Sequence, residues 1–305
     1  MAGEVNGDGP DGPTRPLLPP GRAVELPGRG TTFVRELPGP IGAPTVVLLH
    51  GWTATADLNW FPSYSALSRR FRVMALDHRG HGQGIRSKKP FRLEDCADDA
   101  VALADVSGVD QFIPIGYSMG GPIAQLTWQR HPDRVLGMVL CATSRNFRGT
   151  REEKLGFFGL GSLAVAARVT PGFARSWITT QFLQRRGREY QDWAFQQIER
   201  HDWTTVLEAG RAIGGFSSRD WIREVDVPTA VLVTMRDMVV PVHRQIRLAE
   251  SIPGALAYRI DGGHDACVAV AERFVPTLVA ACTQVAERAR RADSASQAGA
   301  GVGSA

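Results

Sequence analysis

The feature that most constrains the fold of this 305-residue chain is a series of short, continuous apolar runs. Each run is too short for an ordinary helix and is apolar throughout, which is typical of strands buried on both faces of a parallel sheet. The runs are TVVLLH from residue 45, RVMALD from 72, QFIPIGY from 111, VLGMVLCAT from 135 and TAVLVTM from 229.

Segments with apolar residues at helical spacing separate these runs. They are expected at residues 94–106, about 121–130, about 242–251 and about 266–290. The residues from Thr31 to Leu37 are β-branched and partly alternating, which predicts an antiparallel edge strand, and Leu256 to Asp261 predicts the last strand. Repeated strand–helix–strand units predict an α/β fold with a doubly wound sheet and right-handed crossovers.

Residues 144–222 interrupt this alternation. The segment is aromatic-rich and helical in pattern, and it contains no convincing buried strand. We therefore interpret it as a helical insertion over one end of the sheet. Its apolar stretch at residues 155–167 (LGFFGLGSLAVAA) fits a substrate pocket, a lipid-facing surface or simply the insertion's own core, and the sequence leaves these readings open.

Both ends of the chain are predicted to be disordered. Residues 1–21 are rich in Gly and Pro, and residues 291–305 are mostly Ser, Gly and Ala. The predicted core therefore comprises residues 22–143 and 223–290. The first residues lack the basic start and apolar run of a signal peptide, and no stretch is long enough to span a bilayer, so a cytoplasmic location is the default expectation.

Composition excludes several classes of function. The net charge of +4 comes from scattered arginines without interleaved aromatic residues, so no nucleic-acid partner is expected. The four cysteines lie far apart and have no histidine at ligand spacing, so we expect free thiols and no metal site. No dinucleotide or phosphate-loop motif is present, and no cofactor is expected.

The segment Gly116-Tyr117-Ser118-Met119-Gly120 lies directly between a predicted strand and a predicted helix. This is the G-x-S-x-G nucleophile elbow in the context that it requires, and it makes Ser118 the predicted nucleophile. The sharp turn strains the serine backbone and leaves no room for side chains at Gly116 and Gly120. The start of the helix directs backbone N–H groups toward an oxyanion at Ser118.

A serine nucleophile needs a base and an acid that orients the base. His264 follows the last predicted strand and Asp237 follows the strand at 229–235, at the ends of strands where such sites gather. Asp226 lies at the wrong end of its strand, and Asp265 is too close in sequence to orient His264. The other histidines considered are interpreted as core or solvent residues or lie in a different loop: His78, His81, His131, His201 and His243.

From Thr31 to Arg290 the chain resembles the α/β-hydrolase superfamily. The resemblance rests on the elbow, on the chain order Ser118, Asp237, His264, and on two further motifs. His50-Gly51-Trp52 follows the first buried run, and Asp77-His78-Arg79-Gly80-His81-Gly82 follows the second. The superfamily usually has a small hydroxyl residue where this chain has Gly84.

The resemblance implies a mostly parallel, eight-stranded sheet flanked by helices. Residues 144–222 would be the helical cap, inserted between strands six and seven. It also implies that the backbone N–H groups of Trp52 and Met119 form the oxyanion hole, with Gly51 in the loop that presents Trp52.

The function that the resemblance implies is that of a serine esterase or lipase-like hydrolase. Such an enzyme cleaves a carboxylic ester, here a small to medium hydrophobic one, through an acyl-enzyme.

Carbon–carbon bond hydrolysis, perhydrolysis and acyl transfer use the same triad, and the two motifs around Trp52 and Ser118 resemble aryl-esterase and perhydrolase members in particular. Epoxide hydrolases and haloalkane dehalogenases need a carboxylate in place of Ser118. A non-catalytic ligand receptor on the same fold, and lipid contact through the cap, are further alternatives. The sequence does not indicate an oligomeric state.

Overall fold

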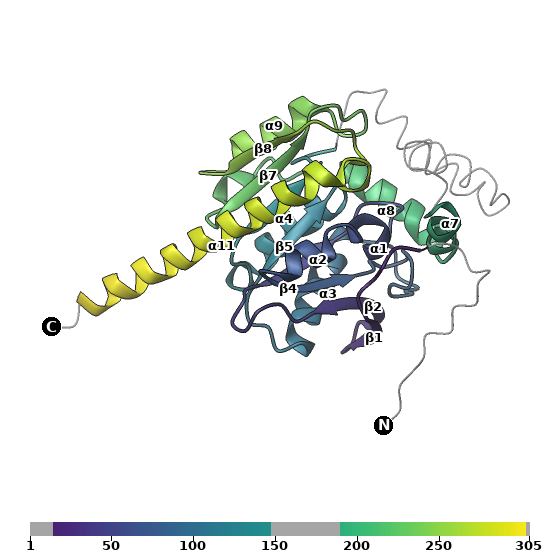
Figure 1. Ribbon diagram of the computed structural model, residues 1–305, viewed down its shortest axis with the longest axis horizontal. Helices are drawn as coiled ribbons and strands as arrows, with labels where there is room; N and C mark the ends of the chain where they lie inside the picture. The colour runs from purple at the N-terminus through teal and green to yellow at the C-terminus, as the bar shows by residue number, and fades with distance from the viewer. Residues whose placement is uncertain (1–14, 148–189, 303–305) are drawn as a thin grey trace.

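The computed structural model describes residues 15–147 and 190–302, and its centre is one twisted eight-stranded sheet (Figure 1). The strand order is β1-β2-β4-β3-β5-β6-β7-β8, in which β2 pairs antiparallel with both of its neighbours, β1 and β4, and all other pairs are parallel. The strands are β1 (Gly21–Leu26), β2 (Gly30–Leu37), β3 (Thr45–Leu49), β4 (Arg72–Leu76), β5 (Phe112–Tyr117), β6 (Met138–Cys141), β7 (Thr229–Thr234) and β8 (Leu256–Ile260).

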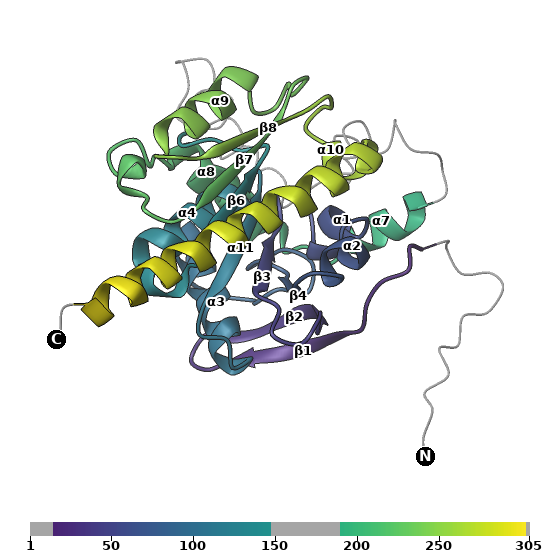
Figure 2. The same ribbon diagram turned by 60° about the vertical axis from the view of Figure 1, so that its left-hand side comes forward.

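Helices cover both faces of the sheet, because alternate residues of the central strands point to opposite sides (Figures 1 and 2). Val47 and Leu49 of β3 pack with one helical layer, and Val46 and Leu48 pack with the other. The first layer contains α3 (Leu93–Val106), α4 (Gly120–Arg130) and α9 (Val242–Ser251), and the second contains α1 (Ala56–Trp60), α2 (Tyr64–Ser68), α10 (Ala266–Ala269) and α11 (Ala271–Val302). The predicted doubly wound sheet is therefore confirmed.

The N-terminal edge of the sheet differs from the prediction. Thr31–Leu37 is antiparallel, but it lies second in the sheet, because β1 pairs with β2 from Gly21↔Arg35 to Leu26↔Gly30. Gly21, which was assigned to the tail, is the first residue of the true edge strand. Four of the six residues of β1 are exposed, so the strand lacks the continuous apolar run that marks the central strands.

The C-terminal end also differs. The single helix predicted for residues 266–290 is divided into α10 and α11, and α11 continues to Val302. A disordered tail from residue 291 is therefore wrong for residues 291–302. The alanines of this stretch are strong helix formers, and they extend the helix beyond the sheet, as Figures 1 and 2 show.

The described part of the 144–222 insertion is helical. It contains α7 (Gln191–Glu199), α8 (Trp203–Gly215) and a 3₁₀ turn at Ile222–Glu224. Residues 148–189, including the apolar stretch at 155–167, lie outside the described residues.

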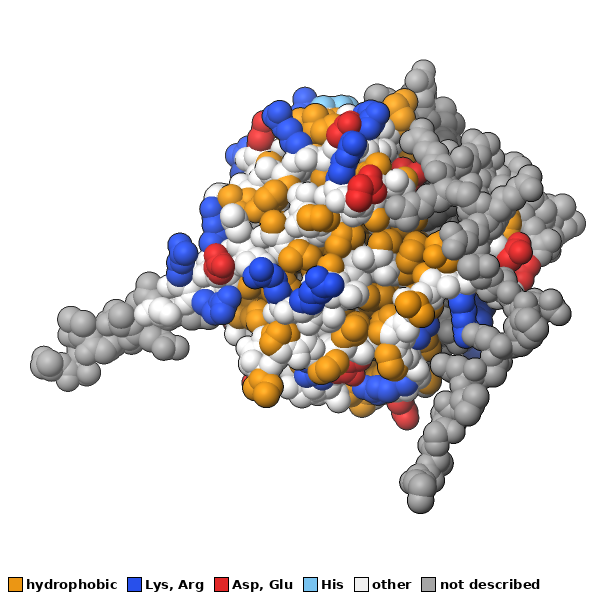
Figure 3. All heavy atoms as spheres, viewed as in Figure 1, with side chains coloured by type: hydrophobic (Ala, Val, Ile, Leu, Met, Phe, Trp, Pro, Cys, Tyr) orange, Lys and Arg blue, Asp and Glu red, His pale blue; other side chains and the backbone are white. Residues whose placement is uncertain are grey.

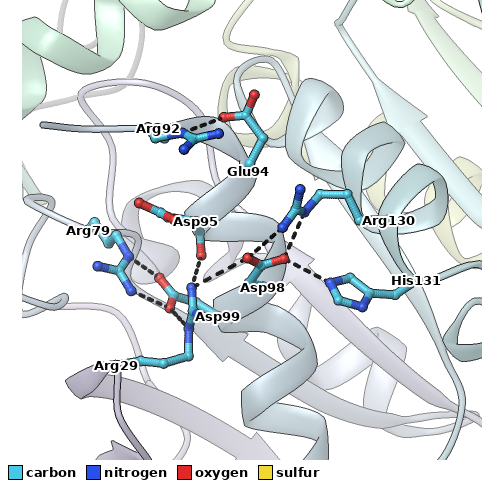
Figure 4. Close-up of polar contacts among 9 residues, drawn as sticks. All are labelled: Arg29, Arg79, Arg92, Glu94, Asp95, Asp98, Asp99, Arg130 and His131. Atoms are coloured by element: carbon cyan, nitrogen blue, oxygen red, sulfur yellow. Dashed lines mark hydrogen bonds and ion pairs between the residues drawn. The ribbon is translucent and has the colours of Figure 1, made fainter.

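An ion-pair cluster on α3 fastens loops to the core (Figure 4). The buried Asp99 carboxylate accepts hydrogen bonds from Arg29 at 2.6 Å and from Nε and Nη2 of Arg79 at 2.5 and 2.7 Å. Asp98 pairs with Arg130 of α4 at 2.8 Å. Arg79 belongs to the loop after β4, so this cluster holds that loop on α3.

All four cysteines are free and buried. Burial raises the pKa of the Cys267 thiol to about 12, and it also raises the pKa values of the other three thiols. The side chains of Lys and Arg are scattered over the face drawn in Figure 3 and form no continuous basic patch there. Among residues 15–147 and 190–302, no helix is long and apolar enough to cross a bilayer.

Candidate active site

Ser118 occupies the turn between β5 and α4, with a φ of +51°. An L residue in this left-handed region is strained by about 1–3 kcal/mol, so the surrounding structure must hold it. The Ser118 N–H donates to the carbonyl oxygen of Cys141 at 2.9 Å, and the Ser118 carbonyl accepts from the Thr143 hydroxyl at 2.8 Å. The strain predicted for the elbow is therefore present, and β6 supports it.

The glycines of the elbow are required by close backbone contacts. A Cβ at Gly116 would lie 2.2 Å from the carbonyl oxygen of Gly120, and one at Gly120 would lie 2.0 Å from that of Leu49. Gly51 is different, because its Cβ would meet the Cβ of Ser118 at 3.4 Å, which is an ordinary contact. The loop after β3 therefore packs directly against Ser118.

A chain of hydrogen bonds joins Ser118 to two loops at the carboxyl ends of β7 and β8. His264 Nε2 lies 2.9 Å from Ser118 Oγ, and His264 Nδ1 lies 2.8 Å from Asp237 Oδ2. Burial alone would raise the pKa of Asp237, but the hydrogen bond and the charge of His264 hold that pKa below its usual range. The carboxylate accepts a hydrogen bond from Nδ1–H, which leaves the Nε2 lone pair facing the serine hydroxyl.

The Asp237 carboxylate is saturated with donors. Oδ1 accepts from the N–H groups of Val239 at 2.8 Å and Val240 at 2.9 Å. Besides His264, Oδ2 accepts from the Thr234 hydroxyl at 2.7 Å and from Gln245 Nε2 at 3.1 Å. Asp237 therefore has one fixed orientation inside the core.

Gln245 and Thr234 are site residues that the sequence analysis missed. Gln245 is completely buried on α9, where it also accepts the Thr234 N–H at 3.0 Å. The available signal was a polar residue between the apolar Val242 and Leu248 on the face of α9 that packs on the sheet.

The competing acids do not reach the histidine. Asp226 lies at the opposite end of β7 and accepts from the Trp128 indole at 3.1 Å. Asp265 precedes α10 as its N-cap residue. Among the described residues, neither is hydrogen-bonded to His264.

Two further side chains connect the loops around Ser118. The Tyr117 hydroxyl donates to the His264 carbonyl oxygen at 2.7 Å. Asn59 Oδ1 accepts the Gly51 N–H at 2.8 Å, while its Nδ2 donates to Cys267 Sγ at 3.3 Å. Asn59 thus links α10, which follows the loop of His264, to the loop after β3, and nothing in the sequence had indicated it.

The loop after β3, residues 50–54, carries Trp52, for which the sequence predicts an oxyanion donor; we therefore call it the oxyanion loop. It closes as a turn in which the Ala54 N–H donates to the Gly51 carbonyl at 3.3 Å, with Thr53 at a φ of +60°. Met119 follows Ser118 at the N-cap of α4, where no preceding helical carbonyl is available to its N–H.

Comparison with known proteins now identifies the family. The sequence profile of the α/β-hydrolase fold matches residues 44–268. The chain belongs to the α/β-hydrolase superfamily of enzymes. A protein of Caulobacter sp. (strain K31), named "Putative carbamate hydrolase RutD", is 26% identical over 245 residues, which is 77% of this chain and 90% of that protein.

Solved structures show the same fold over their whole length. The enol-lactonase from Burkholderia xenovorans LB400 superposes with a TM-score of 0.73 and 25% identity, covering 86% of this chain and all of that one. A thermophilic esterase from Thermogutta terrifontis gives a TM-score of 0.75 and 23% identity, with 87% and 99% of the two chains covered.

This α/β hydrolase carries a layer of four buried histidines beside the oxyanion loop. The ring of His50 lies 4.3 Å from that of His78 and 5.3 Å from that of His81, and His81 lies 5.4 Å from His201. Burial lowers the pKa of all four, to about 3 for His78 and about 4 for His201. Among the described residues, no group of side chains is arranged to hold a metal ion.

The superfamily turn after β4 also explains why this hydrolase has a glycine at position 84. A Cβ there would lie 2.1 Å from the carbonyl oxygen of His78. Asp77 fixes the same turn, because its carboxylate accepts from the N–H groups of Ala56 and Gln83, both at 2.8 Å. Even a small hydroxyl side chain would displace the backbone of this turn.

Proposed function

We propose that this α/β hydrolase is a serine esterase that cleaves small to medium hydrophobic carboxylic esters through an acyl-enzyme. The observation that carries the proposal is the hydrogen-bonded chain from Asp237 through His264 to Ser118, with distances of 2.8 and 2.9 Å. Nucleophile, base and acid lie at hydrogen-bonding distance without any rearrangement of the described residues.

In the first half of the reaction, Ser118 Oγ attacks the ester carbonyl carbon while His264 Nε2 takes the hydroxyl proton. The carbonyl π electrons move onto oxygen and form an oxyanion. When the intermediate collapses, the bond to the leaving alcohol breaks, and His264 returns its proton to that oxygen. The product of this half is an acyl group on Ser118.

In the second half, water takes the place of the alcohol. His264 removes a proton from the water as its oxygen attacks the acyl carbon, and then returns the proton to Ser118 Oγ as the acid leaves. Asp237 stays ionised throughout and stabilises the imidazolium, which its depressed pKa permits.

The oxyanion of both intermediates is assigned to the N–H groups of Met119 and Trp52. Met119 follows Ser118 at the start of α4, where the helix leaves N–H groups without carbonyl partners. Trp52 is in the oxyanion loop that packs against Ser118. Such donors are worth roughly a hundredfold or more in rate each.

The test is hydrolysis of nitrophenyl esters from acetate to long acyl chains, by wild type and Ser118→Ala side by side. The variant should lose at least about a thousandfold in kcat, since only binding and the oxyanion donors remain. An optimum at short to medium acyl length is expected. A Ser118→Ala variant with full activity would overturn the mechanism, and a wild type inert toward the whole series would favour a carbon–carbon bond hydrolase or a ligand receptor.

A second candidate substrate class is suggested by the relatives. The Caulobacter protein is named as a carbamate hydrolase, and the chain covers 90% of it. The enol-lactonase is similar over its whole length. A lactone or a carbamate presents the same acyl carbon to Ser118, so a panel with a matched lactone and carbamate, scored by kcat/KM, separates these substrates from open-chain esters.

A further inference from the structure

The helical insertion contacts the oxyanion loop first through the indole of Trp52. Its Nε1–H donates to the carbonyl oxygen of Val206 in α8 at 2.6 Å. One turn along the same helix, a Cβ at Gly210 would lie 2.7 Å from Trp52 Cζ2. The indole is therefore seated on α8, in a space that only a glycine leaves open.

The second contact lies at the next residue of the loop. His201 Nε2 is 3.1 Å from the carbonyl oxygen of Thr53, and His201 Nδ1 is 2.7 Å from the N of Gly82. Because the Gly82 N–H donates, Nδ1 carries no proton, and the ring's single proton is on Nε2, where it is donated to Thr53. Both bonds require the neutral ring, in agreement with its burial.

The strained backbone of Thr53 must be stabilised by contacts from outside its loop. Threonine is β-branched, and its φ of +60° is a conformation that such residues rarely adopt. A strained backbone persists where its neighbours fix it, and His201 binds the carbonyl of this very residue. If Thr53 relaxed, the turn from Gly51 to Ala54 would open and the Trp52 N–H would point elsewhere.

His201 is itself fixed to the core. The N–H of the next residue, Asp202, donates to the Gly80 carbonyl at 2.8 Å, and Arg86 donates to the Arg200 carbonyl at 2.5 Å. Both partners lie in the loop after β4 that the Arg79–Asp99 ion pair holds on α3 (Figure 4). The position of His201 is therefore set independently of Thr53.

We propose that two residues of the insertion, His201 and Gly210 of α8, are positioning residues for catalysis: they fix the backbone of the oxyanion loop so that the Trp52 N–H faces the oxyanion. We call the pair the loop clamp. This inference rests on the proposed serine mechanism. It gives the insertion a part in the chemical step.

Two substitutions of His201 separate its two hydrogen bonds. In His201→Gln the side-chain amide nitrogen reaches the place of Nε2 and can still donate to Thr53. In His201→Asn the shorter side chain can accept only from Gly82. The exposed His243→Asn on α9 is the matched control. We expect kcat to fall about tenfold to a hundredfold in His201→Asn with KM within about twofold, and to fall by less than about threefold in His201→Gln.

The measurements are kcat per active serine, counted by a fluorophosphonate, and the inhibition constant of a trifluoromethyl ketone that mimics the oxyanion. The clamp predicts that ketone affinity falls in His201→Asn by the same factor as kcat/KM. Equal losses in the two variants, or a loss explained by fewer active serines alone, would reduce His201 to a structural role and overturn the inference. A wild type that reacts with neither ester nor fluorophosphonate would instead overturn the serine mechanism, and the clamp with it.

Discussion

The two sides of Ser118 are held by different parts of the chain. On the acid–base side, the donors to Asp237 come from residues 234–245 and from His264, all within the sheet and its flanking elements. On the oxyanion side, Thr53 and Trp52 depend on His201 and Val206, which belong to the insertion. In the proposed mechanism, proton transfer is therefore organised by the core, whereas the geometry of the oxyanion loop depends on how the insertion packs against it.

The two sides also differ in the kind of polar interaction. Asp237 is a buried charge saturated with donors, so its position is specific and its removal is costly. The oxyanion side instead contains histidine rings in tilted and edge-to-face contact, and neither ring nitrogen of His78 has a hydrogen-bond partner among the described residues. This difference predicts that the two sides fail under different conditions.

The largest expected effect is on the acid–base side. In Asp237→Asn an amide replaces the carboxylate, and it favours the wrong tautomer of His264. We expect kcat to fall about a thousandfold to ten-thousandfold with little change in fold. Ester hydrolysis per active serine is the measurement, with Asp265→Asn as the matched control. A loss below tenfold would show that Asp237 does not orient the base.

As pH falls, the backbone on the oxyanion side of Ser118 should open before the backbone on the acid–base side. Four buried histidines have pKa values below the unfolded value of about 6.5, so their contribution to stability is present above that pH and is lost as pH falls. The pKa of Asp77 is raised to about 6, so its carboxyl binds a proton in the folded state over this pH range and offsets the effect of one histidine. The unfolded state therefore binds about three more protons than the folded state.

The unfolding free energy should therefore drop by up to about 4 kcal/mol from pH 6 to pH 5. Urea titrations at each pH measure it, and hydrogen exchange should show the amides of residues 52–54 opening before those of 239–240. Flat stability over this range would mean that the histidine layer takes up protons in the folded state.

Gln245→Leu removes a buried hydrogen-bonding side chain from the acid–base side of Ser118. The leucine fills a similar volume but leaves the Thr234 N–H without its acceptor and Asp237 without one donor. We expect a loss of about 1–3 kcal/mol in unfolding free energy and a smaller loss in kcat. The exposed Gln284→Leu on α11 is the control, and urea unfolding of both variants decides the outcome. Wild-type stability in Gln245→Leu would contradict the role given to this side chain.

The smallest effects are expected from alanine substitutions at two glycines of α8. Alanine at Gly210 improves helix propensity by about 1 kcal/mol but collides with the Trp52 indole, so we expect unchanged thermal stability and a roughly tenfold lower kcat. Gly215→Ala, which meets no atom within 4 Å, should keep full activity and gain up to about 1 kcal/mol. Equal activity in the two variants would remove Gly210 from the loop clamp.

The sequence predicts some of these regions and misses others. The central strands were predictable because burial on both faces produces continuous apolar runs, and Asp237 and His264 because each follows a predicted strand. The mostly exposed β1 carries no such signal. The contact between His201 and Thr53 spans 148 residues, and no local pattern records a hydrogen bond between a side chain and a distant carbonyl. Gln245 was visible only as a polar residue on an apolar helical face.

The burial of all four cysteines has a practical consequence. Thiols with raised pKa values and no solvent contact react slowly with maleimides, since the thiolate is the reactive form. The natural chain is therefore a clean background for site-specific labelling. A cysteine introduced at the exposed Arg211 of α8 would be the one fast-reacting thiol among the described residues. A dye at that position would report on the seating of α8 in real time.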